Sequence, residues 1–134
     1  MRIAFGTDES TELTAEIIGS LATQGHDVAV LADGDSWPDV GRRVGESVAA
    51  GSADVGIVCC YTGTGVSIAA NKVPGVRAAL CGDAETARGA RLWNDANVLA
   101  LSLRLTSSQV AKEILEAFLT TPVDDDERAT IDRV

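Results

Sequence analysis

Apolar and polar stretches alternate along the chain in a regular order. Short apolar runs of strand length are separated by segments of helix length, and the five runs are Arg2 to Thr7, Asp27 to Leu31, Val55 to Cys60, Val76 to Leu80 and Val98 to Leu101. Strands that alternate with helices predict a parallel sheet covered on both faces. We therefore expect an α/β fold, Rossmann-like, with three α/β/α layers around a five-stranded parallel sheet.

The segments between these runs carry the usual signals for the ends of helices. Ser10 or Thr11 can cap the first helix, which stops at Gly25, and Pro38 can open the second. The last helix, about Ser107 to Leu119, has an apolar stripe with the spacing of a core-facing side. The stripe consists of Val110, Ile114, Ala117 and Phe118.

Length and composition narrow the class of protein. The 134 residues fit one hydrophobic core, so we expect one domain over residues 1–134. The formal net charge of -9 opposes binding to nucleic acid or to an anionic membrane, and no apolar run reaches the roughly 20 residues that span a bilayer. Because a strand pattern begins at once, without a leader-like segment, we expect a cytoplasmic protein.

The cysteines do not indicate a disulfide framework or a metal site. There are three, two of them adjacent, and no spacing of Cys and His suggests zinc. We expect reduced thiols, no metal and no other cofactor.

Polar residues gather where three of the predicted strands end. They are Asp8 to Ser10 after the first, Tyr61 to Gly65 after the third and Cys81 to Asp83 after the fourth. In doubly wound sheets, ligands bind beyond the carboxyl ends of the strands, next to the point where the strand order reverses. We expect the functional site at this edge.

The run Thr62 to Gly65 follows a strand and precedes a helical segment. Its backbone N–H groups can converge on an anion, and two glycines allow close approach. A tight strand-to-helix turn explains the same glycines equally well. Ile68 stands where a dinucleotide-binding fingerprint needs its third glycine, which argues against NAD.

Cys60 ends the third strand directly before this loop. A thiol near a helix N-terminus can serve as a base or a nucleophile, although buried cysteines are more often inert. Cys59 points to the other face of the sheet, so we interpret Cys59 and Cys81 as core residues.

Asp8 and Glu9 are adjacent acids after the first strand. Carboxylates at a strand end can orient sugar hydroxyls or act as acid and base, while the plainer alternative is a helix cap. His26 lies in a turn at the opposite end of the sheet, where we expect a surface role.

Four stretches resemble ribose 5-phosphate isomerase B and its galactose 6-phosphate isomerase relatives: Gly56 to Lys72, Val73 to Cys81, Thr86 to Arg88 and Asn94 to Leu101. The resemblance covers nearly the whole chain. It implies a metal-free homodimer, or a dimer of dimers, in which the partner subunit completes each active site. It also implies interconversion of aldose and ketose phosphates through an enediolate, with the tail, about residues 120–134, reaching the partner.

The resemblance also assigns roles to individual positions. Cys60 matches the base that moves the proton, Thr62 a hydroxyl beside the reacting oxygens, and Asp8 and Asn94 residues that hold substrate hydroxyls. The loop whose N–H groups stabilise the enediolate corresponds to Gly63, Thr64, Gly65, Val66 and Ser67.

The sequence departs from the family pattern around this loop. Glu9 replaces a histidine that helps to bind phosphate, Trp93 replaces the histidine that opens the sugar ring, and Tyr61 replaces a glycine at the pocket mouth. At the C-terminus, phosphate-binding Arg and His positions align with Asp126, Glu127 and Thr130. Arg88, Arg91 or Arg128 could compensate for them.

Four functions fit these observations. The first is an aldose-ketose isomerase with an altered substrate, unphosphorylated or already open-chain. The second is an orthodox ribose 5-phosphate isomerase, and the third a non-catalytic sugar-binding or partner subunit. The fourth, nucleotide binding through Gly63 and Gly65 with Asp83 on a ribose, depends on spacing alone.

Overall fold

The computed structural model describes residues 1–134 and has the alternation that the apolar runs predict. The strands are β1 (Arg2–Thr7), β2 (Asp27–Asp33), β3 (Val55–Cys60), β4 (Ala78–Leu80) and β5 (Val98–Ser102). The helices are α1 (Glu12–Thr23), α2 (Trp37–Ala49), α3 (Thr64–Asn71), α4 (Ala84–Asn94), α5 (Ser108–Thr120) and α6 (Arg128–Ile131), with a 3₁₀ turn, Asp125–Glu127, before α6.

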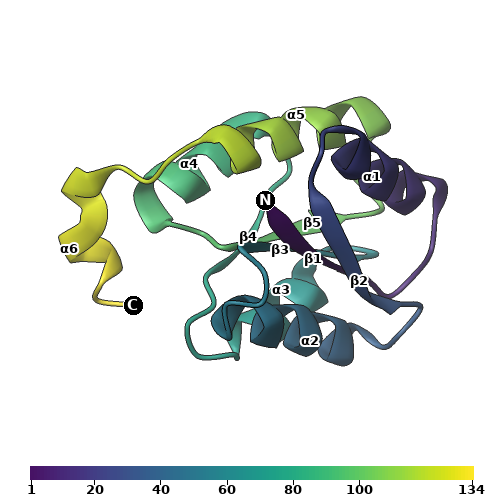
Figure 1. The fold of residues 1–134 in the computed structure, drawn as a ribbon, viewed down its shortest axis with the longest axis horizontal. Helices are drawn as coiled ribbons and strands as arrows, with labels where there is room; N and C mark the ends of the chain where they lie inside the picture. The colour runs from purple at the N-terminus through teal and green to yellow at the C-terminus, as the bar shows by residue number, and fades with distance from the viewer.

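All five strands are parallel, and their order in the sheet is β2-β1-β3-β5-β4. Helices α1, α4 and α5 cover one face and α2 and α3 cover the other, which gives the three predicted layers (Figure 1). Strand β2 lies on one side of β1 and β3 lies on the other, so the strand order reverses between β1 and β3. The carboxyl ends of these two strands are therefore the place to look for a site.

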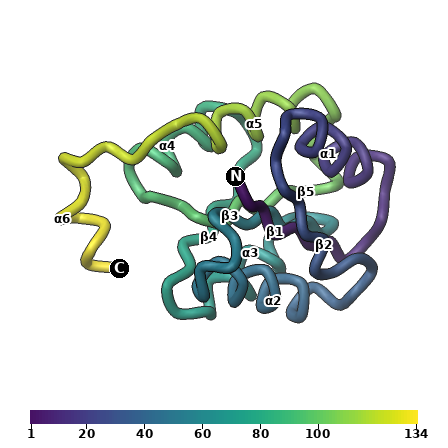
Figure 2. The backbone as a smooth tube through the Cα atoms, in the orientation of Figure 1, coloured from purple at the N-terminus to yellow at the C-terminus, as the bar shows by residue number.

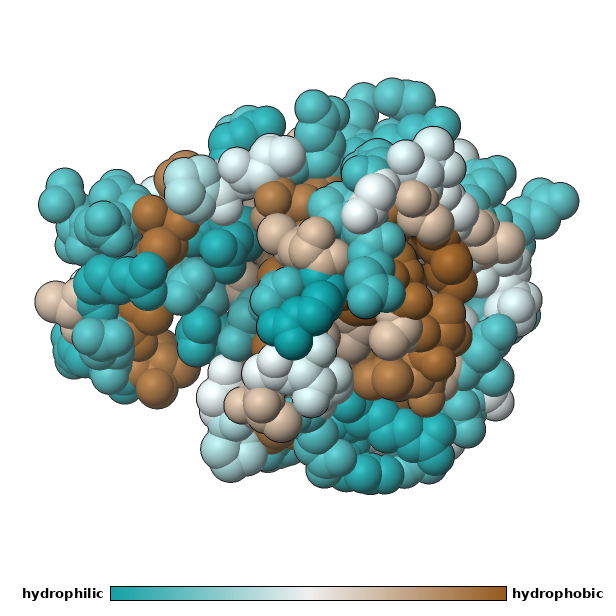
Figure 3. Space-filling view, viewed as in Figure 1, coloured by the Kyte–Doolittle hydropathy of each residue, from teal (hydrophilic) through white to brown (hydrophobic).

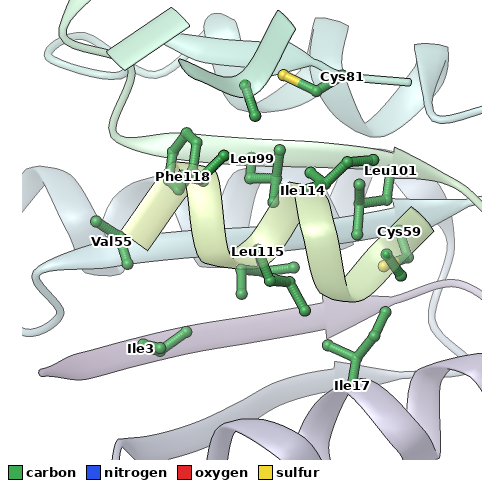
Figure 4. Close-up of a cluster of buried hydrophobic side chains, with 14 of the residues drawn as sticks. Ile3, Ile17, Val55, Cys59, Cys81, Leu99, Leu101, Ile114, Leu115 and Phe118 are labelled. Carbon is green, nitrogen blue, oxygen red and sulfur yellow. The ribbon is translucent and has the colours of Figure 1, made fainter. Parts of the chain in front are cut away.

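Two apolar clusters hold the layers together. One lies between the sheet and α1, α4 and α5, where Phe118 and Ile114 of α5 pack on Leu99 of β5 (Figure 4). The other lies under α2 and α3 and includes Val44 and Val66. Every residue of β3 and β5 is buried, as expected for central strands covered on both faces.

Several element ends follow from local hydrogen bonds. Thr11 caps α1 in a reciprocal capping box with Thr14, so Thr11 rather than Ser10 is the cap. Strand β4 is shorter than predicted because the N–H of Arg77 donates to the side chain of Asn97, at 2.8 Å, instead of joining the ladder. The Asn71 side chain bonds both backbone groups of Ala78 at the outer edge of β4.

The C-terminal segment leaves the layers after α5. It passes the end of α4, where the Asp124 N–H donates to the Leu92 carbonyl at 2.9 Å, and forms α6 at a distance from the sheet (Figure 2). The space-filling view shows α6 set apart from the main body (Figure 3). None of the helices combines the length and apolar character that crossing a membrane requires.

Candidate active site

The sheet register brings Asp8 and Cys60 to the same edge. Thr7 of β1 is paired with Cys59 of β3, and the Asp8 N–H donates to the Cys59 carbonyl at 3.2 Å. Asp8 and Cys60 are therefore the next residues on two adjacent strands, at the point where the strand order reverses. This placement agrees with the prediction of a site at the carboxyl edge.

The two adjacent cysteines face opposite sides of the sheet. Cys59 belongs to the cluster under α1, α4 and α5, whereas Cys60 belongs to the cluster under α2 and α3. Burial raises the pKa of the Cys59 thiol strongly, and it raises the pKa of Cys81 to about 11, so both remain protonated at neutral pH. Cys60, with 5% of its surface exposed, ends β3 directly before the glycine loop.

The loop after Cys60 turns directly into α3. Gly63 has a left-handed conformation, with φ of 76°, and stands at the N-cap of that helix. The first N–H groups of a helix have no partner within it and carry the positive end of its dipole. The hydroxyls of Thr62 and Thr64 lie 2.7 Å apart, while the Tyr61 side chain is 59% exposed at the mouth of the loop.

Packing requires both glycines of this loop. A Cβ on Gly63 would lie 3.0 Å from the carbonyl oxygen of Leu101, and one on Gly65 would lie 2.8 Å from the Trp37 ring. Trp37 therefore lies against Gly65 at the start of α3. A pyrophosphate group could not approach Gly65 as closely as a dinucleotide site requires, which further weakens the nucleotide hypothesis.

Asp8 has an oxygen without a partner. Its Oδ1 is buried and accepts no hydrogen bond, and the pKa of Asp8 is raised by burial and, to a smaller extent, by the charge of Glu9. Glu9 is exposed and forms a tight turn in which the Thr7 hydroxyl donates to its carbonyl at 2.7 Å. Because Thr11 caps α1, neither acid has that structural role.

The predicted residues Trp93 and Asn94 lie at the opposite edge. They end α4, and Asp95 to Asn97 lead from them into the amino end of β5, where the Asn97 N–H donates to the Arg77 carbonyl at 3.0 Å. The five residues of β5 span about 16 Å. Within one chain, Trp93 and Asn94 are therefore separated from Cys60 by the length of the sheet.

The three arginines considered as phosphate ligands are already paired. Arg88 bonds Glu85, while Arg91 and Arg128 both bond Asp95, each at 3.0 Å. Asp95 also pairs with Arg77 at 3.3 Å. These guanidinium groups hold α4, α6 and the start of β4 together. They are therefore not free to replace the missing phosphate ligands.

The sequence analysis missed Arg104. It follows β5 at the carboxyl edge, is exposed, and its N–H donates to the Tyr61 carbonyl at 2.9 Å, while its guanidinium joins none of the ion pairs of the structure. Its place after the fifth strand could have identified it, because that strand ends at the same edge of the sheet as the three strands considered above.

Two other singled-out residues have local roles. Asp83 caps α4 by accepting from the Thr86 N–H at 2.7 Å, a bond that lowers the pKa of Asp83 and occupies the carboxylate that the nucleotide hypothesis assigned to a ribose. His26 lies 3.1 Å from the N-terminal amine, away from the site. No group of His, Cys, Asp and Glu is arranged to hold a metal ion.

The chain was compared with known proteins. A model described as Ribose/Galactose Isomerase matches residues 3–134. The chain belongs to this family. As a member of this isomerase family, it is 39% identical to ribose-5-phosphate isomerase B of Escherichia coli K12 over 88% of this chain and 83% of that protein. It is 38% identical to galactose-6-phosphate isomerase subunit LacB of Clostridium acetobutylicum over 89% and 72%.

A solved family member has the same architecture. Ribose-5-phosphate isomerase B of Clostridium thermocellum superposes with a TM-score of 0.92 at 37% identity, covering 99% of this chain and 94% of that one. The resemblance described from the motifs and the predicted α/β/α fold are both confirmed. The chain is an isomerase of this family, with its own residues at several positions around the loop.

Proposed function

We propose that the protein is an aldose-ketose isomerase that works through an enediolate. The observation that carries this proposal is Cys60 at the end of β3, directly before N–H groups that begin α3. The thiolate removes a proton from the carbon next to the carbonyl and, as the thiol, delivers it to the carbonyl carbon, so the bond electrons pass through the enediolate. A hydroxyl proton passes at the same time from the oxygen of the first carbon to the oxygen of the second. Thr62 lies beside the reacting oxygens, and the N–H groups of Gly63 to Ser67 stabilise their negative charge.

Two copies of the chain form the site. Asp8, Glu9 and Tyr61 hold the substrate from the chain that supplies Cys60, whereas Trp93 and Asn94 come from the second copy. The separation of about 16 Å along β5 supports this arrangement, because one chain cannot bring both sets to one substrate. The assembly is a homodimer or a dimer of dimers, with the C-terminal segment reaching the partner.

The substrate is a sugar without a phosphate group. Where the resemblance implies cationic phosphate contacts, this chain has Asp126, Glu127 and Thr130, all near or on the exposed α6. A unit charge about 5 Å from a phosphate is worth roughly 3 kcal/mol at an effective dielectric constant near 20. Replacing cations by anions therefore opposes a phosphorylated substrate.

The substrate also arrives in its open-chain form. Trp93 stands where the resemblance implies a ring-opening histidine, and an indole N–H donates a hydrogen bond but cannot shuttle a proton. Ring opening in solution would then precede binding of the reactive form.

Isotope exchange on a set of sugars tests the chemistry. Wild-type protein with ribose, galactose or their terminal phosphates should incorporate solvent deuterium at the carbon next to the carbonyl. Cys60→Ala should lower turnover by roughly 10² to 10⁴-fold, the usual contribution of a general base. Cys81→Ala removes another buried thiol and is the matched control, whose turnover should be kept. Full turnover in Cys60→Ala would exclude the assigned base.

One observation favours a phosphorylated substrate instead. Arg104 is a cation at the carboxyl edge beside Tyr61 and has no carboxylate partner. If it binds phosphate, Arg104→Gln should raise KM for ribose 5-phosphate about tenfold or more and leave KM for ribose unchanged. Arg43→Gln, which removes an exposed arginine of α2, is the control. Equal effects on both sugars would favour the unphosphorylated substrate.

A further inference from the structure

Hydrogen bonds join the turn after β5 to the loop that follows β3. The Leu103 N–H donates to the Cys60 carbonyl at 3.0 Å, and the Arg104 N–H donates to the Tyr61 carbonyl at 2.9 Å. A side chain adds to these backbone bonds, because the hydroxyl of Ser102 also donates to the Tyr61 carbonyl, at 3.1 Å. The turn after β5 therefore holds two consecutive carbonyls, the first of which belongs to the proposed base.

Ser102 makes this contact from a buried position. It ends β5, is paired with Cys60 in the sheet register, and has 6% of its surface exposed. The Leu105 N–H donates to its hydroxyl oxygen at 3.1 Å, so the hydroxyl both accepts and donates. A buried hydroxyl that makes both bonds is held in one orientation. The Ser102 side chain is therefore a fixed support for the carbonyl of Tyr61.

The direction of the Tyr61 carbonyl determines where the next N–H group points. The chain has no cis peptide bond, so the Tyr61 carbonyl and the Thr62 N–H point in opposite directions from one planar group. The carbonyl points toward the end of β5, and β1 lies on the other side of β3. The Thr62 N–H is therefore directed to the side of β3 on which Asp8 lies.

The Thr62 N–H is one of a series of free donors. It donates to no acceptor within the chain, and neither do the N–H groups of Gly63, Thr64 and Gly65. The Ser67 N–H is the first to bond back to this loop, at 3.2 Å from the Gly63 carbonyl. Donors that are fixed before the reaction stabilise developing negative charge without having to reorient. The Thr62 N–H extends this series by one residue toward the proposed base.

We propose that Ser102 is a positioning residue for isomerisation, whose hydroxyl holds the peptide between Tyr61 and Thr62 so that the Thr62 N–H faces the oxygens of the enediolate. The inference rests on the proposed function, because it requires negative charge that develops beside Cys60. Ser102 acts through this peptide and does not contact the substrate. Without its hydroxyl, the Arg104 N–H is the remaining donor to the Tyr61 carbonyl, and the peptide gains freedom to rotate.

Steady-state kinetics test the role of Ser102 in the reaction, on whichever of ribose, galactose and their terminal phosphates wild-type protein converts fastest. Ser102→Ala should lower kcat roughly 10- to 100-fold and leave KM nearly unchanged, because a misplaced donor matters most in the transition state. Ser102→Thr keeps a hydroxyl and should retain more of kcat. Thr106→Val removes the hydroxyl of another buried residue of this turn, and its kcat should equal that of wild type.

Two kinetic outcomes would overturn the proposal. One is a kcat of Ser102→Ala that is equal to that of Thr106→Val. The other is a Ser102→Thr protein that melts like wild type and loses as much of kcat as Ser102→Ala, because the hydroxyl would then not be the group that matters.

NMR of the free protein tests the positioning separately from catalysis. The residual dipolar coupling of the Thr62 N–H reports the direction of that bond. It should change in Ser102→Ala and stay as in wild type in Thr106→Val. An unchanged coupling in Ser102→Ala would overturn the proposal, whether or not a sugar is isomerised. A changed coupling in protein that isomerises none of the sugars would support the positioning of Thr62 by Ser102 and contradict only the proposed function.

Discussion

Asp8 is the residue at which the candidate site departs most from ordinary packing. A buried carboxylate oxygen without a hydrogen bond is rare in folded proteins and is a common property of functional groups. The neighbouring Glu9 adds repulsion instead of compensation. This carboxylate is therefore better suited to accept hydrogen bonds from substrate hydroxyls than to stabilise the protein without a substrate.

Asp8→Asn should separate stability from function. The pKa of Asp8 is raised above its ordinary value of 3.8, so the folded chain holds this proton more tightly than the unfolded chain. Asp8 consequently lowers stability as pH rises through its folded pKa, and below about pH 3.8 the difference disappears. The variant should melt at a higher temperature than wild type at pH 7 and at the same temperature at pH 3, while turnover falls about tenfold or more.

Glu9→Gln is the matched control for that experiment. It removes the neighbouring charge from an exposed side chain, so it should raise the melting temperature at pH 7 less than Asp8→Asn does. A variant Asp8→Asn that is less stable than wild type at pH 7 would contradict the proposed strain at this carboxylate.

At the level of elements, the apolar runs predict much of the fold. The predicted bounds of β1 and β3 are confirmed. β2 continues to Asp33, beyond the predicted Leu31, and β4 begins at Ala78 because side-chain bonding at Arg77 replaces the ladder. The position of β5 between β3 and β4 could not be predicted from the sequence, since an apolar run does not specify which strands lie next to it.

The candidate site was predicted less completely than the fold. Residues on strand ends could be placed at one edge, but Trp93 and Asn94 end a helix that starts at the carboxyl edge and runs back to the amino edge. Their separation from Cys60 follows from that direction. The unpartnered oxygen of Asp8 and the contact of Trp37 with Gly65 depend on side-chain packing, which sequence periodicity does not contain.

Asp95 should control the attachment of α6. It joins Arg77, Arg91 and Arg128, and its φ of 47° is a conformation that asparagine also tolerates. Asp95→Asn should therefore remove the charge without backbone strain, lower the free energy of unfolding by about 1–3 kcal/mol, and speed amide exchange in residues 124–134. Chemical denaturation and hydrogen exchange measure the two effects.

A second carboxylate of the same segment provides the comparison. Asp125 is 92% exposed and lies 3.7 Å from Arg128, so Asp125→Asn should change stability by less than about 1 kcal/mol. Equal exchange rates in Asp95→Asn and wild type would show that α6 is held by its apolar contacts instead.

At the scale of the whole molecule, two defective chains should restore one another. If Cys60 and Trp93 of different copies serve one substrate, a heterodimer of Cys60→Ala and Trp93→Ala contains one intact site and one site with both defects. Random mixing in a closed two-fold dimer should then recover about a quarter of the wild-type rate. Subunits exchanged by mild denaturation and refolding, followed by the isomerase assay, measure this recovery.

Each variant refolded alone is the control for mixing. A mixture that is no more active than the average of the two single variants would show that Cys60 and Trp93 of different copies do not serve one substrate. Sedimentation of the mixed sample checks that dimers have formed.

Asn71 has a consequence for how the sheet can grow. Its amide takes both backbone groups of Ala78, as a neighbouring strand would, on an edge strand of only three residues. A strand from another chain would therefore find few free backbone N–H and C=O groups at this edge. The opposite edge is β2, with seven residues and with Val30 and Leu31 exposed at 46% and 36%. Strand addition to this sheet, by a partner or by aggregation, is thereby directed to one side.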